Sequence, residues 1–231
     1  MILRELTKLH RAIGQDLIID GICYYMNQND RIVATATQEL ISGEVSLLNG
    51  VEVIDDEAFF ECNNLKTIEI PDSVIEIGVS AFRWCENLKD IEIPDSVTKL
   101  GKGAFNMCCR LESVTMSESI REIRESTFAH CTNLQKVRNI DNITILDTWA
   151  FGGCWSLKEI KIPDKLHQIG DYAFFGCSSL TNIELPKSLK KVGDSAFKNC
   201  INLTDVRAPK YFGKFIDRVF GSNEIINFDF Y

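Results

Sequence analysis

Seven of the nine cysteines recur at a fixed interval of 23 residues, and this row of thiols is the first feature that could do chemistry. The row consists of Cys62, Cys85, Cys108, Cys131, Cys154, Cys177 and Cys200. Neighbouring thiolates can ligate zinc or carry out thiol–disulfide exchange. Zinc ligands, however, come as cysteine pairs about two to four residues apart, which this spacing does not supply. The interval therefore argues against a metal or redox site.

Other residues with catalytic potential share no pattern. The three histidines, His10, His130 and His167, stand at unrelated positions of the 23-residue interval, so they form no nucleophile–base set. The glycines lack the spacing of a phosphate-binding loop. We predict that the chain is not an enzyme, with no catalytic residue, no cofactor and no metal site. Cys109, outside the row, is predicted to be an exposed and reactive thiol.

The same interval runs through the phenylalanines and leucines, and it determines the architecture. Eight of the 14 phenylalanines keep this interval, namely Phe59, Phe82, Phe105, Phe128, Phe151, Phe174, Phe197 and Phe220, and seven leucines keep it from Leu65 to Leu203. A fixed period between about 20 and 50 residues is the signature of a solenoid. Because the cysteines share the phase of the phenylalanines, we predict that both rows face the core and that the thiols stay reduced.

The unit 65–87, LKTIEIPDSVIEIGVSAFRWCEN, shows how one turn of the coil begins. Its first residues follow L-x-x-I-x-I, in which Ile68 and Ile70 alternate with polar residues as in a half-buried strand. Pro71 ends the strand, since proline cannot donate a hydrogen bond to a ladder. Each turn therefore contributes one short strand to a parallel sheet.

The second half of the unit returns the chain to the next strand. Val74 and Ile77 are expected to point inward on a second side of the coil. Gly78 is expected to give the corner a permissive backbone. Phe82 and Cys85 fit a short helical turn that faces the core.

The third and fourth units depart from this pattern. In the fourth, Asn139 replaces an inward aliphatic residue and Ile140 replaces the proline. A bulge that turns Ile140 inward would repair the core. Asp147 and, in the third unit, Arg124 replace the corner glycine. Drift of the repeat and a local functional demand both account for these changes.

The residues before and after the regular units are predicted to cap the coil. An amphipathic helix is expected near the start, where apolar residues stand at helical spacing: Ile2, Leu6, Leu9, Ile13 and Leu17. Residues 20–37, DGICYYMNQNDRIVATAT, indicate two strands around a turn at 27–30. At the other end, Ile225, Phe228 and Phe230 fit the strand pattern only if one residue is deleted.

At L-x-x-I-x-I-P-x-x-V-x-x-I-G-x-x-A-F-x-x-C, the chain resembles the BspA-type leucine-rich repeat family over about Val51 to Phe220. The resemblance implies an α/β fold: a leucine-rich repeat solenoid that winds as a right-handed superhelix, with a parallel β-sheet on its concave face and short helical turns opposite. We predict a helix and hairpin cap at 1–50 and a solenoid of about seven units at 51–231. The family motif contains no catalytic residue, so the resemblance also implies a non-enzymatic binding module.

Composition and charge restrict the partners. The net charge is −8 over 231 residues, which argues against a nucleic-acid footprint because that requires a basic face. No run of 18 apolar residues occurs, so no membrane span is predicted. Charged residues interrupt the start of the chain, which predicts no signal peptide and a cytoplasmic location. The family resemblance instead implies the cell surface or secretion.

Outward strand positions supply the first candidate protein-binding residues. An acidic end gives way to a basic centre along two rows, and the candidates are Glu69, Asp90, Glu92, Lys136, Arg138, Lys161 and Arg207. Solenoids bind partners through extended concave surfaces. Simple solubility explains the same charges, and both interpretations stay open here.

Aromatic residues at outward positions supply the second candidate surface. These are Phe60, Trp84, Trp149, Trp155 and Phe175. Aromatic residues are enriched at interface hot spots. Packing between adjacent turns of the coil accounts for them equally well.

Two functions follow from these observations. The first is a non-enzymatic protein–protein interaction module, of surface or adhesion type, that binds a protein or another macromolecule. The second is a cytosolic structural or scaffolding repeat protein in which the N-terminal helix mediates self-association. In both cases we expect a monomer or a weak dimer.

Overall fold

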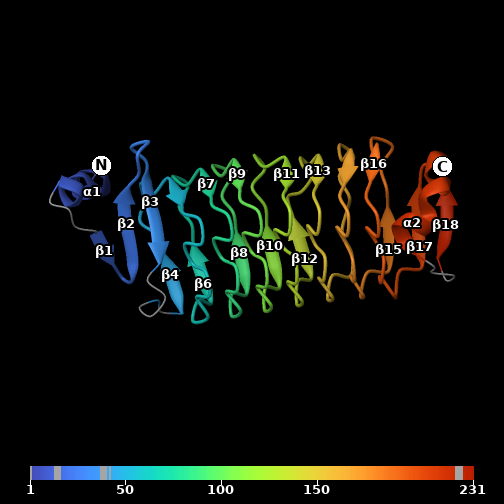
Figure 1. Ribbon diagram of the computed structural model, residues 1–231, viewed down its shortest axis with the longest axis horizontal. Helices are drawn as coiled ribbons and strands as arrows, with labels where there is room; N and C mark the ends of the chain where they lie inside the picture. The colour runs from blue at the N-terminus through green and yellow to red at the C-terminus, as the bar shows by residue number, and fades with distance from the viewer. Residues whose placement is uncertain (1, 13–16, 37–40, 42, 222–225) are drawn as a thin grey trace.

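The protein is an elongated coil whose turns lie side by side, with the two ends of the chain at opposite ends of the molecule (Figure 1). The computed structural model describes residues 2–12, 17–36, 41, 43–221 and 226–231. The predicted solenoid with parallel sheets is confirmed. The predicted boundary between a cap and a solenoid at residue 50 remains a prediction.

One row of short parallel strands runs the length of the coil. Its members are β4 (Glu44–Ser46), β6 (Thr67–Glu69), β8 (Asp90–Glu92), β10 (Ser113–Thr115), β12 (Lys136–Arg138), β15 (Asn182–Glu184), β17 (Asp205–Ala208) and β18 (Asn227–Phe230). Ser113 pairs with Asp90 on one side and Lys136 on the other, so the register equals the repeat. Because side chains alternate along a strand, the middle residue of β10, Val114, is buried while its neighbours face outward.

The last strand confirms the expected deletion. Asp205 pairs with Asn227 and Val206 with Phe228, one residue short of the regular interval. Ile225, which was assigned to the start of the same pattern, lies outside the described residues.

A second row of two-residue strands lies on the next side of the coil and was not predicted. It consists of β5 (Val53–Ile54), β7 (Glu76–Ile77), β9 (Lys99–Leu100), β11 (Glu122–Ile123), β13 (Ile145–Leu146), β14 (Gln168–Ile169) and β16 (Lys191–Val192). Its inward residues include Ile77, which was predicted to be buried and is. The row is interrupted between β9 and β11.

The phenylalanine segments form hydrogen-bonded turns rather than the predicted helical turns, because two residues per unit have left-handed backbone angles. One lies two residues before the phenylalanine: Glu57, Ser80, Gly103, Ser126, Trp149, Tyr172 and Ser195. The other lies two residues after it: Glu61, Trp84, Met107, His130, Gly153, Gly176 and Asn199. An α-helix requires negative φ at every residue, so the chain cannot remain helical across these segments.

The phenylalanines form one stacked column through the coil. All eight are buried, and the centroids of successive rings lie between 5.0 and 5.5 Å apart. This stack confirms that the row faces the core. Each ring covers the next, so no unit can bury its apolar residues without a neighbour.

The cysteine row lies beside this column and is also buried, as predicted. Its thiols do more than fill space. The Cys85 Sγ donates a hydrogen bond to the Phe59 carbonyl oxygen of the preceding turn at 3.0 Å. The same contact recurs up to Cys200 Sγ and the Phe174 carbonyl at 3.1 Å. The thiols therefore join adjacent turns as hydrogen-bond donors.

The corner glycines are required because the backbone of the preceding turn lies too close to admit a Cβ. They are not required, as predicted, for a permissive backbone conformation. Gly78 is absent from the residues with positive φ. A Cβ at Gly78 would lie 2.5 Å from the Asp56 backbone nitrogen, and one at Gly101 would lie 2.2 Å from the Gly78 carbonyl oxygen. Arg124 and Asp147 take the place of this glycine in two units, where the phenylalanine rings are 5.5 Å apart, and the rings are equally far apart in the next step, which retains Gly170.

We expect Gly101→Ala to lower the free energy of unfolding by about 1–3 kcal/mol, since its Cβ would overlap the backbone of the preceding turn. Urea denaturation followed by circular dichroism measures this change. Gly213→Ala is the matched control, because a Cβ there meets only the Phe230 ring, at 3.7 Å. Equal stability of the two variants would contradict the close-approach explanation.

The N-terminal segment covers the first turn of the coil. Its elements are α1 (Ile2–Ala12), β1 (Leu17–Ile19), β2 (Ile22–Met26) and β3 (Ile32–Ala36). The predicted hairpin is confirmed, since β2 and β3 pair antiparallel, and β3 pairs in parallel with β5. This pairing joins the hairpin to the second row of strands.

The helix α1 does not bury the expected apolar stripe. Leu3 and Thr7 face the core, whereas Leu6 is 37% exposed and Leu9 is 58% exposed. Leu17 is buried but belongs to β1, and Ile13 lies outside the described residues. The helix therefore packs through a narrow contact and leaves two leucines exposed.

The C-terminal end is closed by aromatic residues. The 3₁₀-helix η2 (Lys210–Phe215) leads into α2 (Ile216–Phe220), and Phe212 and Phe220 are buried. The Phe228 ring meets Phe220, the last ring of the column, edge to face at 5.4 Å. Large side chains thus cover the end of the stack.

Candidate functional site

The first row of strands presents one outward surface, which we call the strand face. It consists of the outward side chains of β6, β8, β10, β12, β15 and β17 and those of residues 159–161. It corresponds to the predicted concave face. All seven charged candidates are exposed on it: Glu69, Asp90, Glu92, Lys136, Arg138, Lys161 and Arg207. Since the strand register equals the repeat, these side chains stand in two straight rows.

The strand ladder of this face is interrupted twice. Strands β6 and β8 belong to different sheets, and residues 159–161 form no strand between β12 and β15. Both interruptions coincide with like charges on neighbouring turns. Glu69 stands next to Glu92 at the first, and Arg138 next to Lys161 at the second. Like charges directly opposite each other destabilise a strand pair, which supplies a physical reason for both openings.

The steps β4–β6, β15–β17 and β17–β18 carry complementary side chains and are intact, whereas the step from residues 159–161 to β15 is open although Lys161 stands next to Glu184. Arg207 on β17 forms ion pairs with Glu184 on β15 at 3.1 Å and with Asp229 on β18 at 3.4 Å. Ser46 on β4 donates a hydrogen bond to Glu69 on β6 at 2.9 Å. Of the seven charged candidates, Arg207 is therefore held within the protein and is the least available to a partner.

A local backbone change adds to the second interruption. Asn139 has a φ of 59°, and the following Ile140 is buried, as predicted for a bulge that restores the core. Asparagine tolerates this left-handed conformation better than most residues. Within the described part of the chain, no backbone hydrogen bond joins residues 158–162 to the turn before them.

A hollow of about 630 Å³ opens at the first interruption. Four carboxylates line it and no basic residue does: Glu69, Asp72, Glu92 and Asp95. We call this hollow the acidic cleft. Asp95 accepts a hydrogen bond from the Glu118 backbone N–H at 2.7 Å, so its carboxylate is held in place.

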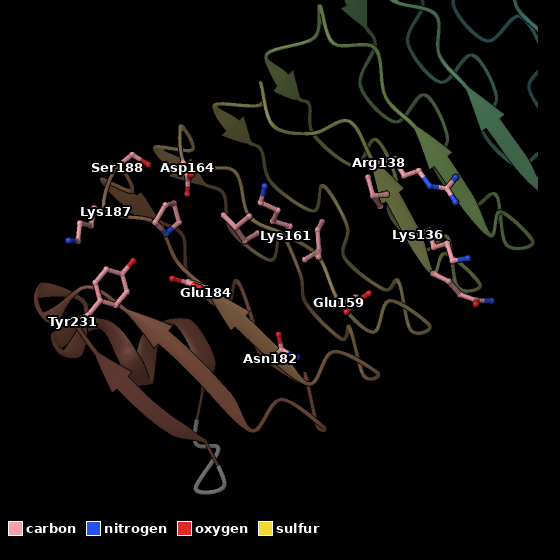
Figure 2. A pocket seen from close by; sticks show the side chains of 15 residues that line it. Lys136, Arg138, Glu159, Lys161, Asp164, Asn182, Glu184, Lys187, Ser188 and Tyr231 are labelled. Carbon is pink, nitrogen blue, oxygen red and sulfur yellow. The ribbon is translucent and has the colours of Figure 1, made fainter.

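A larger hollow of about 1040 Å³ opens at the second interruption, and we call it the central hollow. Apolar residues that line it include Val137, Ile160 and Ile162. Figure 2 shows Lys136 and Arg138 at one side, Lys161 between the strands, and Glu184 and Tyr231 at the other side. The hollow is therefore bordered by both signs of charge.

The cations of the central hollow differ in their availability. Lys161 forms an ion pair with Asp141 at 3.1 Å. Lys187 lies over the Tyr231 ring, 5.4 Å from its centroid. Among the described residues, no ion pair engages Lys136 or Arg138, and both are exposed. We call these two residues the basic pair.

The aromatic candidates do not form one surface. Trp149 stacks between His130 and Tyr172, with ring centroids 5.8 and 5.2 Å away, and Phe175 lies 5.3 Å from Trp149. These four residues form an aromatic cluster. Trp84 and Trp155 are not part of it, and Phe60 instead lies beneath the Arg83 guanidinium at 6.0 Å.

The aromatic cluster has a structural explanation. A Cβ at Gly152 would lie 2.2 Å from the Trp149 ring, so the indole packs directly against the backbone of its own turn. Trp155, by contrast, is 57% exposed. Packing between turns therefore accounts for Trp149 and Phe175, while Trp155 is the aromatic candidate available at the surface.

The thiols are placed for structure and not for reactivity. Burial raises the pKa of Cys62 to about 11 and that of Cys200 to about 12, and it also holds the pKa values of Cys108 and Cys154 well above the usual range. The thiolate is the nucleophile, so these groups are inert at neutral pH. Cys109 is half-buried and not exposed as predicted, and burial raises its pKa, which lowers its thiolate fraction at neutral pH.

No group of histidine, cysteine or acidic side chains within the described residues is arranged to hold a metal ion. Across the same residues, no helix has both the length and the apolar content to cross a membrane.

The repeat matches the model of the BspA-type leucine-rich repeat region, in six copies, over residues 41–157 and 148–231. The chain belongs to the BspA-type leucine-rich repeat family. The match covers most of the chain, so the resemblance inferred from the sequence is confirmed. None of the curated proteins compared with the chain matches it significantly.

Solved bacterial structures share this fold. A leucine-rich repeat protein from Bacteroides ovatus is 30% identical, with a TM-score of 0.65 over 83% of this chain and 56% of that chain. One from Eubacterium ventriosum is 26% identical, with a TM-score of 0.68 over 76% and 49%. The BspA-type chain thus spans about half the length of these two relatives.

A leucine-rich cell surface protein from Faecalibacterium prausnitzii is 21% identical, with a TM-score of 0.57 over 84% of this chain and 70% of that chain. At this identity the likeness concerns the fold alone.

Proposed function

We propose that this BspA-type protein is a non-catalytic protein-binding module that uses its strand face. The observation that carries the proposal is the basic pair, Lys136 and Arg138, which is exposed beside a hollow of about 1040 Å³ and has no ion-pair partner among the described residues. Charges that the fold does not neutralise are free to meet a partner and to set its orientation. Extended faces of solenoids serve this purpose in general.

The chemistry of the coil supports a non-catalytic role. The thiols of the row are buried, and burial raises the pKa of each. The half-buried His130 stacks against Trp149. A nucleophile and a base must lie within hydrogen-bond reach in a cleft, and neither hollow of the strand face contains a histidine or cysteine.

A surface or adhesion role is supported by the family and by the fold shared with a protein described as a cell surface protein. The second candidate is an intracellular scaffold that self-associates through its N-terminal helix. The exposed Leu6 and Leu9 on α1 favour this second function, since adjacent apolar side chains on a helix suit a helix–helix contact.

The binding proposal is tested by capturing partners with three immobilised forms of the full chain. The wild type is compared with Lys136→Glu/Arg138→Glu/Lys161→Glu and with the control Lys190→Glu/Lys191→Glu/Lys198→Glu, whose exposed lysines lie away from the strand face. Both variants change the net charge equally. Partners are identified by mass spectrometry and then measured as purified proteins.

We expect the strand-face variant to lose a partner that the wild type and the control both bind. If the partner binds all three forms equally, the strand face is not the binding surface. Loss of binding in both variants would mean that net charge alone governs the association.

A further inference from the structure

The strand face carries two separated charges of opposite sign. The four carboxylates of the acidic cleft lie on the turns of β6 and β8, the lining of the cleft extends past Thr115 to Asn139, and the basic pair lies on β12. Neighbouring parallel strands are about 4.8 Å apart, so Arg138 lies roughly 10 Å along the coil from Glu92 and roughly 14 Å from Glu69. The registers β8–β10 and β10–β12 fix this separation.

The strand between the carboxylates and the basic pair presents only uncharged side chains. Strand β10 presents only Ser113 and Thr115, both half-buried. The Ser113 hydroxyl donates its hydrogen bond to Asp90, within the strand face. A bound chain could therefore pass over β10 without meeting a large or charged side chain.

We propose that the strand face binds an extended segment of a partner protein that carries cationic and anionic side chains about four residues apart. An extended chain advances about 3.3 Å per residue and presents residues i and i+4 on one face, roughly 13 Å apart. The cation enters the acidic cleft and the anion meets the basic pair. This inference rests on the proposed function and adds the chemistry of the partner.

Charge complementarity selects this partner over others. A nucleic acid would bring phosphates against the four carboxylates of the acidic cleft, which repel them. A purely basic segment would be repelled by Lys136 and Arg138, and a purely acidic one by Glu69 and Glu92. Only a segment with both signs at the stated separation satisfies both sites.

The test uses a dye-labelled heptapeptide, Arg-Arg-Thr-Ser-Thr-Glu-Glu, and fluorescence anisotropy with the full-length protein at low salt. The control peptides are Arg-Glu-Thr-Ser-Thr-Glu-Arg, which has the same composition but carries both signs at each end, and Arg-Arg-Thr-Ser-Thr-Arg-Arg. We expect the first peptide to bind about fivefold or more tightly than either control, and to weaken as salt is raised.

Charge reversals in the protein then locate the peptide. The variants Glu69→Lys/Glu92→Lys and Lys136→Glu/Arg138→Glu are each expected to weaken binding of the first peptide about fivefold or more. The variant with all four substitutions is expected to regain wild-type affinity within about threefold, because the peptide can lie in the opposite direction. All these side chains are exposed, so folding is preserved and is checked by circular dichroism.

Equal affinity of the wild type for the three peptides overturns the inference, as does the absence of any binding. The inference is also overturned if the variant with all four substitutions does not regain affinity for the first peptide. In each of these cases, a partner captured through the strand face in the test of the proposed function would still support that function. The proposed function and this inference can therefore fail separately.

Discussion

Above about pH 9, we expect the protein to lose stability steeply and to unfold within about one to two pH units. Burial raises the pKa of all seven thiols of the row, that of Cys62 to about 11 and that of Cys200 to about 12. A thiol in the unfolded chain has a pKa near 8.5. Between these values the unfolded state loses protons that the folded state retains, so raising the pH favours unfolding.

The size of the effect follows from the number of thiols. Each thiol that stays protonated only in the folded state lowers the free energy of unfolding by about 1.4 kcal/mol per pH unit. Seven such groups give about 10 kcal/mol per pH unit, which is comparable to the whole stability of a typical domain. Below about pH 8 both states are protonated and the row has no effect on pH dependence.

Urea denaturation at pH 8.0, 8.5, 9.0 and 9.5 with a reductant present measures this dependence. The double variant Cys131→Ala/Cys154→Ala removes two buried thiols, so the slope of unfolding free energy against pH is expected to fall by about 3 kcal/mol per pH unit. A stability that stays constant from pH 8.0 to 9.5 would contradict the assignment of these thiols to the core.

Phe128→Ala is expected to lower the free energy of unfolding by about 3–5 kcal/mol. Phe128 is fully buried near the middle of the column, and its ring stacks on Phe105 and on Phe151 at 5.5 Å each. Its removal leaves a cavity and breaks the stack between two halves of the coil. Since each unit contacts only its neighbours, the two halves are also expected to unfold less cooperatively.

Chemical denaturation monitored by far-ultraviolet circular dichroism measures both effects. Trp155→Ala is the matched control, because it also removes an aromatic side chain, but one that is 57% exposed. We expect this control to change stability by less than about 0.5 kcal/mol. A comparable loss in both variants would mean that the column contributes no more than the surface does.

Much of the fold could be predicted because one interval repeats through residues of several kinds. Phe82, Cys85 and Ile68 each stand in a fixed phase, and a fixed phase in a solenoid is a fixed direction toward or away from the core. The irregular fourth unit was also predictable, since the core requires an apolar side chain and Ile140 was the residue able to supply it.

The remaining features depend on distances between turns, which one repeat does not reveal. Gly78 was assigned to an unusual backbone, whereas the adjacent turn excludes a Cβ there. The left-handed residues around Phe82 are Ser80 and Trp84, and neither type suggests positive φ from sequence. The turns were therefore expected to be helical, and they are not.

The strand face could be predicted in part. The direction of Glu69, Glu92 and Arg138 followed from the alternation of strand residues. The two hollows did not, although the signal was present as like charges on neighbouring turns. Trp149 and Phe175 of the aromatic cluster were candidates from the sequence, but the stacking of His130 on Trp149 was not predicted, because these two residues occupy different phases of the repeat and meet only when the two turns are in contact.

The thiol contacts between turns have a consequence for how the coil can change length. Each turn is joined to the preceding one by the same Cys Sγ to Phe carbonyl bond, so any regular turn presents equivalent upper and lower surfaces. Duplicating the unit 111–133, which carries β10 and makes the same contact through Cys131, would therefore insert one compatible layer and shift everything beyond it by about 4.8 Å. Each duplication of this unit in the gene would thus increase the distance between the acidic cleft and the basic pair by one equal step.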